Sequence, residues 1–569
     1  KLTHLLNYNQ TFYKHDIGML LGFEEERFVK RTTDTAKLGL IDSSVGDSSS
    51  ATTPSSIGGT GEEFTSRSYF GRINYAFDSR YLFEVNMRYD GSSRFAPDNR
   101  WGLFPSFSAG WRISEERFMK GLPIDNLKLR ASWGKLGNNA IGNYEWQAVY
   151  NSAKYAFGGS LNNGLAITSI SNNLLEWEST AITNIGIDFA TLRNRLTFEA
   201  EFYNKVTDGI LYRPDMYMSL GTASGPRQNI AEVTNRGIEM TLNWQDRIGK
   251  VEYRVSGNFA YNQNKVSKYK GELQRGWVTD ENGNRVYQTN IGDVSTGGST
   301  RVIEGKMINE YYMLQPYKGS GNGFNADGTV NINGGPRDGM IRTVDDMKWL
   351  NAMVGAGYKF YPRQNVSKSG IWYGDYIYAD LNGDGVYGND ADNEFQGCSN
   401  VPKYNFGLQA SANWKGFDFS MNWSGAAGFK IYYYRLALNS SATIKGYAIG
   451  EAIANDHYFF DPKNPNDPRT NLSSKNPRLT NNSGNDQSGM TQSSVHLQKG
   501  DYIKLKNLTI GYTLPAVLSK KVYAQNIRFF ASGENLFTIT GYEGMDPEMR
   551  TAVGYSTMRQ YAFGVNITF

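Results

Sequence analysis

The segment from Tyr81 to Tyr89 reads YLFEVNMRY, and all of its odd-numbered residues are apolar or aromatic. Between them stand Glu84, Asn86 and Arg88. Successive side chains of a β-strand point to opposite faces of a sheet, so this period of two predicts a strand with one apolar face and one polar face.

The same alternation recurs in LTFEAEFYN at 196–204 and in FDFSMNW at 417–423. Two architectures use such a pattern. A secreted all-β sandwich turns the polar face to water, whereas a membrane barrel turns the apolar face to lipid, and alternation alone does not decide between them. Strands of about ten residues or more favour the barrel, because they are long for a sandwich and match a tilted membrane crossing.

The composition agrees with a barrel that shows lipid only every second residue. The 569 residues include 37 Tyr and 30 Phe, yet the mean hydropathy is −0.52. No segment has the roughly 18 consecutive apolar residues that a transmembrane helix needs. The single cysteine, Cys398, excludes an intramolecular disulfide framework, and a net charge of +4 without a concentrated basic patch argues against a nucleic-acid partner.

Fifteen strands are predicted, joined alternately by short and long links. The strands are expected at 2–13, 15–24, 66–77, 79–90, 100–112, 125–135, 178–190, 195–206, 234–246, 251–265, 403–414, 416–428, 502–513, 525–534 and 557–569. Short links are expected at 13–15, 78–79, 193–194, 246–250 and 415–416, and long loops near 25–65, 136–177, 207–233, 266–402 and 429–500. Outer-membrane barrels alternate short periplasmic turns with long external loops in this way. A further pair of strands near 308–380 would raise the number to seventeen.

The two ends of the chain predict a fragment of a larger barrel. The opening KLTHLLNYNQTF has neither an initiator Met nor a signal peptide, and it already reads as a strand. The closing YAFGVNITF alternates up to Phe569, and a terminal Phe resembles the signal read by the outer-membrane assembly machinery. We therefore expect residues 1–569 to be the C-terminal portion of a transmembrane antiparallel β-barrel of the all-β class.

Five long segments resemble those of the SusC/RagA family, the TonB-dependent transporters of Bacteroidetes. They are RYDGSSRFAPDNRWGLFPSFSAGWRISEE from Arg88, LEWESTAITNIGIDFATLRNRLTFEAEFYNKVTDGIL from Leu175, NIAEVTNRGIEM from Asn229, GDYIKLKNLTIGYTLP from Gly500 and NIRFFASGENLFTITGYEGMDPE from Asn526. Their Asp-Gly and Pro-Asp-Asn clusters also have a local explanation, because such residues reverse the chain between strands. The resemblance is specific for the family and says little about the substrate.

The resemblance implies a multi-pass, 22-stranded barrel in the lipid of the bacterial outer membrane. It also implies a plug domain, which we expect to be absent from these 569 residues, and a TonB complex that acts through the missing N-terminal region. A SusD-like surface lipoprotein is expected as the lid, in a dimer of transporter–lipoprotein pairs. The implied cargo is an oligosaccharide or a peptide, and no cofactor is required.

Aromatic residues in the long loops are candidate substrate contacts. Trp372-Tyr373 and the run Tyr432, Tyr433, Tyr434 and Arg435 offer ring faces and a guanidinium group to a sugar. The second run follows a membrane strand, so the aromatic girdle at the lipid interface is the favoured interpretation of these tyrosines, ahead of substrate binding. The Asn- and Ser-rich stretch 464–494 reads as a solvated loop or as part of the contact with the lid lipoprotein.

One acidic loop resembles part of a calcium site. The sequence ADLNGDGVYGNDAD places Asp380, Asn382 and Asp384 at alternating positions, as the first half of an EF-hand loop does. The residue at the twelfth position is Ala391, which cannot bind a metal, although Asp390 and Asp392 flank it. The alternatives are a structural Ca²⁺ site and a solvated, Asx-rich turn, and similar DLNGDG segments occur in the SusC/RagA family.

No motif predicts an enzyme. The four histidines, His4, His15, His457 and His496, form no metal-ligand spacing, and no nucleophile elbow or phosphate-binding loop is present. Cys398 has no histidine near it in sequence. Two hypotheses remain: an importer of an oligomeric nutrient, with a glycan favoured over a peptide, and a surface receptor or adhesion barrel that transports nothing.

Overall fold

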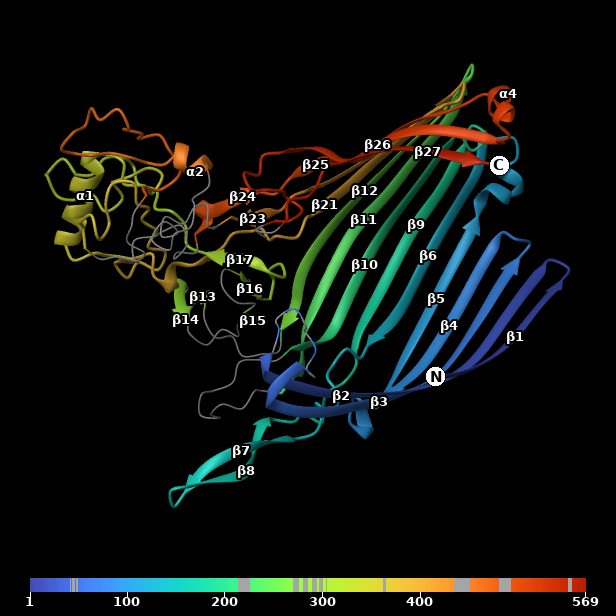
Figure 1. Ribbon diagram of the computed structural model, residues 1–569, viewed down its shortest axis with the longest axis horizontal. Coiled ribbons are helices and arrows are strands. Elements are labelled where there is room, and N and C mark those ends of the chain that lie inside the picture. Colours follow the sequence, from blue (N-terminus) through green and yellow to red (C-terminus); the bar gives the residue numbers. More distant parts are fainter. Residues whose placement is uncertain are drawn as a thin grey trace. The chain divides into compact units, whose positions relative to one another are not determined.

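The computed structural model describes residues 1–40, 42, 44, 47, 50–212, 226–269, 276–279, 285–288, 294–295, 300–302, 304–361, 365–433, 451–479, 493–550 and 555–569. The chain divides into two compact units, residues 1–238 with 267–271 and residues 239–266 with 272–569. Most of the described secondary structure is β-strand (Figure 1). Within the described residues, no helix combines the length and the apolar character needed to cross a membrane.

Fifteen strands form one large antiparallel sheet, and their order in the sheet follows their order in the sequence (Figure 1). They are β1 (Leu2–Phe12), β2 (His15–Leu40), β3 (Ala51–Phe77), β4 (Tyr81–Ser92), β5 (Trp101–Arg112), β6 (Ile124–Asn138), β9 (Glu178–Thr191), β10 (Leu196–Tyr212), β11 (Gln228–Ile248), β12 (Val251–Tyr269), β21 (Tyr404–Trp414), β22 (Phe417–Ala427), β25 (Tyr502–Thr513), β26 (Asn526–Thr540) and β27 (Gln560–Thr568). These are the fifteen strands predicted from the sequence. The described strands between 308 and 380 are β17 (Glu310–Met313) and β18 (Lys359–Phe360), and both belong to other, smaller sheets. The prediction that this region could add two strands to the large sheet was therefore wrong.

The short links are tight turns with left-handed backbone. In the link between β21 and β22, Lys415 has a φ of 47° and Gly416 a φ of 89°, as a two-residue type I′ turn requires. A Cβ atom on Gly416 would lie 2.6 Å from the carbonyl oxygen of Thr513, so glycine also permits the close approach of β25. Tyr13 and Asp78, in two other predicted short links, also have positive φ. The predicted positions of these turns are confirmed.

The loop predicted at 25–65 was wrong, because most of it is strand. β2 and β3, of 26 and 27 residues, pair continuously from His15–Phe77 to Leu40–Ala51, with a bulge at Ala36 and Lys37. Arg27 pairs with Glu63 at 3.1 Å, and the rings of Phe28 and Phe64 stack at 5.2 Å. The part of the β2–β3 hairpin that replaces this loop has charged residues on both faces. It therefore lacks the apolar alternation of a strand that faces lipid or a core.

The other long loops also contain secondary structure. The loop predicted at 136–177 carries a separate hairpin of β7 (Val149–Phe157) and β8 (Ser160–Ser169). The loop predicted at 207–233 is shorter than expected, since β10 continues to Tyr212 and β11 begins at Gln228. The two longest loops, near 266–402 and 429–500, contain helix α1 (Val344–Gly355), helix α2 (Glu451–Asn455) and several short strands.

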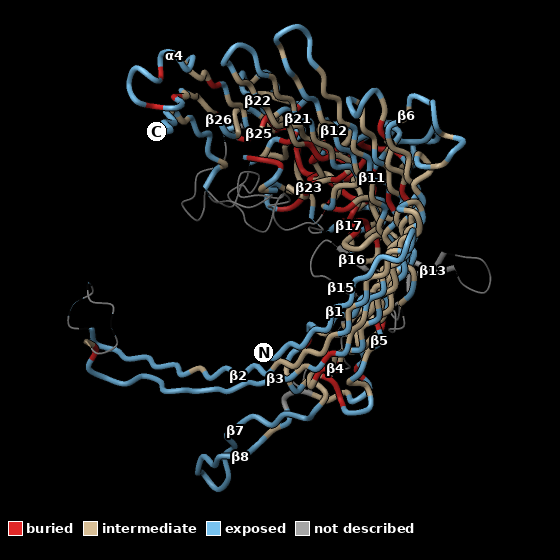
Figure 2. The backbone as a smooth tube through the Cα atoms, turned by 90° about the vertical axis from the view of Figure 1, so that its right-hand side faces the viewer, coloured by how far each residue is buried: buried red, intermediate tan, exposed pale blue. Residues whose placement is uncertain are grey.

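The apolar face of the sheet is the exposed one. Phe83 and Met87 on β4 are each 50% exposed, and Phe107 on β5 is 47% exposed, whereas Glu84 and Arg88 on the opposite face are half-buried. Figure 2 shows the sheet strands mostly in the exposed and intermediate colours. A soluble sandwich would cover such a surface, because an extended apolar patch in water is unfavourable. The secreted sandwich is therefore excluded, and the apolar face is the one that lipid covers.

Two rows of aromatic rings border this apolar band in the first unit. One row lies near the short turns, and its ring centroids are 4.9 to 6.4 Å apart: His15, Phe77, Tyr81 and Trp111. The other row lies toward the long links, with spacings of 4.8 to 6.2 Å: Phe23, Tyr69, Trp101 and Tyr89. Tyr81 and Tyr89 are separated by about 27 Å along β4, close to the roughly 25 Å apolar band of outer-membrane barrels.

The orientation of β4 can be tested with two neighbouring substitutions. Val85→Arg places a charge in the middle of the apolar band, and we expect it to lower the free energy of unfolding by about 2–4 kcal/mol. Asn86→Arg is the matched control, since it adds the same charge to the polar face, and we expect a change within about 0.5 kcal/mol. Urea unfolding of the complete protein refolded into lipid vesicles measures both. Equal losses would contradict the assignment of the two faces.

Candidate functional site

Three of the segments that resemble the SusC/RagA family meet at the long-link end of the first unit. Phe95 is fully buried and its ring lies 5.2 Å from that of Trp177. The indole Nε1 of Trp177 donates to the carbonyl oxygen of Arg100 at 3.0 Å. Asn229 Nδ2 donates to the carbonyl oxygens of Glu176 at 3.0 Å and of Gly209 at 2.8 Å. These residues hold neighbouring links together, which supports the interpretation of the motifs as scaffold.

The other two segments meet in the second unit through a buried lysine. Lys504 on β25 is 1% exposed, and its Nζ lies 2.6 Å from Asp546 Oδ2 and 2.7 Å from Glu548 Oε2. Lys506 Nζ also reaches Glu548, at 2.6 Å. Charge-assisted hydrogen bonds of this length are strong, and a buried lysine requires them. The cluster ties the link between β26 and β27 to strand β25.

The two longest loops pack into one compact body in the second unit, termed the loop body here: residues 304–361, 365–403, 428–433, 451–479 and 493–501. Its core consists of buried side chains from both loops: Leu314, Tyr317, Met340, Ile341, Met347, Trp349, Leu350, Met353, Phe360, Ile371, Tyr373, Tyr376, Ile377, Tyr378, Tyr387 and Tyr458. Helix α1 supplies Trp349, Leu350 and Met353, and its start is closed by a capping box between Thr343 and Asp346. The loop body therefore has a hydrophobic core of its own.

Hydrogen bonds from one loop to the other hold the loop body together. Arg478 makes a two-pronged ion pair with Asp375, at 2.8 and 2.9 Å, and Asp375 is 2% exposed. Arg342 Nη1 donates to the carbonyl oxygens of Leu472 at 2.6 Å and Ser474 at 2.8 Å. The hydroxyl of Tyr458 donates to the carbonyl oxygen of Arg342 at 2.6 Å.

A cavity of about 630 Å³ lies where the two loops meet. Its lining residues are Lys368, Trp372, Tyr373, Asn455, His457, Tyr458, Phe459, Phe460, Asp461, Pro462, Arg469, Asn471, Arg478 and Leu479. Its volume is typical of small-ligand sites, and its walls combine aromatic rings with a few polar groups, as such sites do. Trp372 and Tyr373, which the sequence analysis singled out, both line this cavity.

The other predicted contacts lie elsewhere. The ring of Tyr432 lies 6.1 Å from that of His496, and the ring of Tyr433 lies 5.4 Å from that of Tyr542. Both tyrosines pack between links of the second unit, and neither lines the cavity. Tyr434 and Arg435 lie outside the described residues.

Most of the cavity wall was missed by the sequence analysis. His457 and Phe459 to Asp461 carry no motif, and Arg469, Asn471, Arg478 and Leu479 belong to the stretch interpreted as a solvated loop or a lipoprotein contact. These residues share only their position near Trp372 in the folded protein. No local sequence pattern indicates that position. The nearest available signal was the aromatic pair Phe459-Phe460 in an otherwise polar stretch.

The acidic loop is closed by hydrogen bonds to its own backbone. Asp380 Oδ1 accepts from the amide of Gly383 at 2.7 Å, and its Oδ2 accepts from the amide of Gly385 at 2.9 Å. Asp384 Oδ1 accepts from the amide of Val386 at 2.8 Å. The bond from Val386 to Asp384 is an Asx turn, and the two bonds to Asp380 close the wider loop around it.

The remaining predicted ligands of this loop are also engaged in its fold. Asn382 Nδ2 donates to Asp384 Oδ2 at 2.9 Å, and Asp390 begins a short 3₁₀ turn that ends at Asp392. Asp392 accepts from the amide of Leu381 at 2.7 Å, and from two further amides. In the described part of the chain, no three His, Cys, Asp or Glu side chains converge as metal ligands. Calcium binding here stays a prediction.

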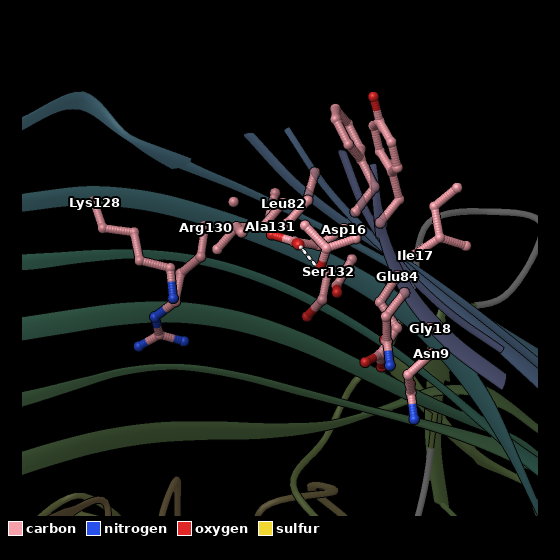
Figure 3. Close-up of a pocket in the computed structure, with 18 of the residues that line it drawn as sticks. Asn9, Asp16, Ile17, Gly18, Leu82, Glu84, Lys128, Arg130, Ala131 and Ser132 are labelled. Atoms are coloured by element: carbon pink, nitrogen blue, oxygen red, sulfur yellow. Dashed lines mark hydrogen bonds between the residues drawn. The ribbon is translucent and has the colours of Figure 1, made fainter. Parts of the chain in front are cut away.

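A second cavity, of about 590 Å³, lies on the polar face of the strands in the first unit (Figure 3). Asp16, Glu84, Arg130 and Ser132 are among its lining residues. Arg130 forms ion pairs with Asp188, at 3.0 Å, and with Glu201. The wall therefore carries polar and charged groups, as the inner face of an outer-membrane barrel does.

The arrangement defines a class of protein: an outer-membrane β-barrel with a polar inner face, an exposed apolar outer face and long, folded links between strands. A profile of the family described as TonB dependent receptor-like, beta-barrel, matches residues 3–536. The chain belongs to this family, and it is an outer-membrane protein.

Similar proteins place the chain beside SusC and RagA. It is 29% identical to TonB-dependent receptor P39 of Formosa agariphila, over all of the chain and 52% of the relative. It is 28% identical to TonB-dependent receptor SusC of Bacteroides thetaiotaomicron, over 88% of the chain and 43% of the relative. The solved structure of the RagAB peptide transporter has the same fold, with a TM-score of 0.75 at 22% identity over all of the chain and 55% of its own. The predicted SusC/RagA resemblance is confirmed, and the chain spans about half the length of these relatives.

The ion pair inside the loop body gives a stability prediction. Arg478→Met leaves the Asp375 carboxylate buried without its partner, and we expect this loss to destabilise the loop body by about 3–5 kcal/mol. Lys348→Met is the control, because it breaks an exposed pair with Asp345 on α1 and should cost no more than about 0.5 kcal/mol. Hydrogen exchange of residues 365–379 in the complete protein measures the opening. Unchanged protection in Arg478→Met would contradict the role of this pair.

The acidic loop gives a pH prediction. Burial raises the pKa of the Asp392 carboxyl from 3.8 to about 6, although three backbone amides favour its charged form. The folded loop therefore binds this proton more tightly than the unfolded one. Protonated Asp392 therefore stabilises the folded loop fully below about pH 4. This stabilisation is lost as the pH rises through 6, and the loss lowers the free energy of unfolding by at most about 3 kcal/mol.

Hydrogen exchange of the amides of Leu381 and Gly388 between pH 4 and pH 8, corrected for intrinsic rates, tests this expectation. Asp392→Asn cannot ionise, so it should lower the overall protection and remove the pH-dependent part. The same pH dependence in both proteins would assign the titration to another group.

Proposed function

We propose that the complete protein imports an oligomeric nutrient across the outer membrane in a TonB-dependent manner. Membership of the TonB-dependent receptor family supports this proposal, and so does the charged inner face around Arg130. The observation that carries most weight is the pairing of that polar face with an exposed apolar face, because it describes a wall between lipid and an aqueous path. No catalytic role is proposed.

A SusD-like surface lipoprotein and the TonB complex are the proposed partners, in a dimer of transporter–lipoprotein pairs. The similarity to SusC and to the RagAB transporter supports this assembly. The folded loops would form the surface on which the lipoprotein closes. TonB would act through a region that precedes the residues described.

A glycan is the favoured cargo. Trp372 and Tyr373 line a cavity in the loop body, where they offer flat apolar surface and polar tips to a sugar ring. The peptide transporter RagAB shares the fold, so a peptide cargo is the alternative within the same mechanism. A surface receptor that transports nothing is the alternative from a different class.

Growth of a deletion strain tests the function. We expect loss of growth on one class of purified glycan as sole carbon source. The intact gene should restore growth, and a variant gene lacking the TonB box should not. Immunodetection at the cell surface must show equal amounts of both proteins. Loss of growth on peptides alone would favour the peptide alternative, and unchanged growth on every nutrient would contradict import.

A further inference from the structure

We propose that the cavity between Trp372 and His457 is a binding site for an uncharged sugar unit of the transported glycan. The inference rests on the proposed function, which it deepens by assigning a site and a ligand chemistry. The cavity is built entirely by the loop body, at the long-link end of the sheet. Cargo held there would meet the protein before it reaches the membrane strands.

Aromatic rings form one wall of the cavity. The rings of Trp372 and Tyr373 meet edge to face at 5.2 Å, and the ring of Phe460 supports Tyr373 in the same manner at 5.0 Å. Trp372 is only half-buried, whereas Tyr373 is buried. Such packing fixes the rings while leaving indole surface open. The C–H face of a pyranose or furanose ring can pack on a flat apolar surface of this kind.

Several polar groups at the cavity have no hydrogen-bond partner in the part of the chain that the structure describes. Within the described residues, no hydrogen bond is made by the indole Nε1 of Trp372, the hydroxyl of Tyr373 or the side-chain amide of Asn455. Burial raises the pKa of Tyr373, so its hydroxyl stays protonated. These groups provide donors and acceptors together, which matches a ligand rich in hydroxyl groups.

His457 adds a directed acceptor. Its Nδ1 lies 3.0 Å from the carbonyl oxygen of Ile453, which can only accept, so Nδ1 carries a proton. In the neutral ring, Nε2 is then an acceptor, and within the described residues it has no hydrogen-bond partner. A sugar hydroxyl can donate to it.

The arginines of the wall are already neutralised. Arg478 is paired with Asp375, and Arg469 lies 2.8 Å from Asp467. Hydrogen bonds from Arg469 lower the pKa of the Asp467 carboxyl to about 2, so this pair stays ionised. Each guanidinium group therefore already has a carboxylate partner in the protein. Lys368 and Asp461 also line the cavity and bring one charge of each sign, so the charges of the wall balance and favour an uncharged sugar.

A peptide fits this wall less well. One recurring way to recognise an extended peptide is to add it as a strand to a free sheet edge. The described wall of the cavity has only an isolated bridge between Phe459 and Asn471, so it offers no ladder to extend. Its binding groups are side chains that converge on one compact volume.

Binding by the complete protein in detergent tests the proposal. The probes are uncharged oligosaccharides of glucose, mannose, xylose and fructose, with oligogalacturonate, sulfated oligosaccharides and mixed pentapeptides as comparison, measured by isothermal titration calorimetry. We expect at least one uncharged oligosaccharide to bind. Trp372→Ala should weaken it at least tenfold, and Tyr373→Phe or His457→Phe two- to fivefold.

Two controls make the result interpretable. Trp372→Phe retains an aromatic face. If the sugar stacks on this face, Trp372→Phe should bind the oligosaccharide more tightly than Trp372→Ala does. Phe324→Ala removes an aromatic side chain of the loop body, 44% exposed and outside the cavity, and should bind as the parent does. Protection of the loop body from trypsin confirms that each variant is folded.

Failure of the site and failure of the proposed function give different results. The site proposal is overturned if no uncharged oligosaccharide binds, if only charged oligosaccharides or peptides bind, or if Trp372→Ala binds as the parent does. Import that persists in cells would leave the proposed function standing in each of these cases. Cavity-dependent binding of a sugar that cells do not import would support the site and contradict import.

Discussion

The structure depends on one constraint: each backbone N–H and C=O group inside a lipid bilayer must find its hydrogen bond within the protein. In the fifteen-stranded antiparallel sheet, every strand between β1 and β27 satisfies these groups through a neighbour on each side. Because side chains then alternate between faces, the apolar residues Phe83 and Met87 are left exposed for lipid, and Glu84 and Arg88 face the polar side. The polar average composition is a direct consequence, since only every second residue of a strand is required to be apolar.

Because the strands place their large apolar side chains outward, the deeply buried side chains lie largely in the links. Trp349, Phe360 and Tyr458 are almost completely buried within the loop body, and Phe95 and Leu175 are buried between links of the first unit. A loop with a core of its own can hold side chains in defined positions, as a small domain does. This explains how long external links can present a shaped cavity.

Paired charges join the segments that are distant in sequence. Lys504 binds Asp546 and Glu548, and Arg478 binds Asp375 across more than one hundred residues of chain. Lys504 and Asp375 are almost completely buried, so each requires its charged partner in a specific geometry. In the cavity the same pairing has a chemical consequence, because it leaves the wall without an unpaired guanidinium group.

The sequence by itself determined the sheet, because the strand period, the turn residues and the spacing of links are local properties of neighbouring residues. It also pointed to Trp372 and Tyr373, which are adjacent in the chain. It did not reveal the long hairpin of β2 and β3, since the mixed charges from Glu24 to Lys37 hide the alternation. In the acidic loop, the spacing of Asp380 and Asp384 suits a metal and a backbone amide equally, and only the tertiary structure shows the amides that they bind. The meeting of Trp372 with His457 and Arg478 was likewise decided by tertiary packing, because contacts between separate loops leave no periodic trace in either one.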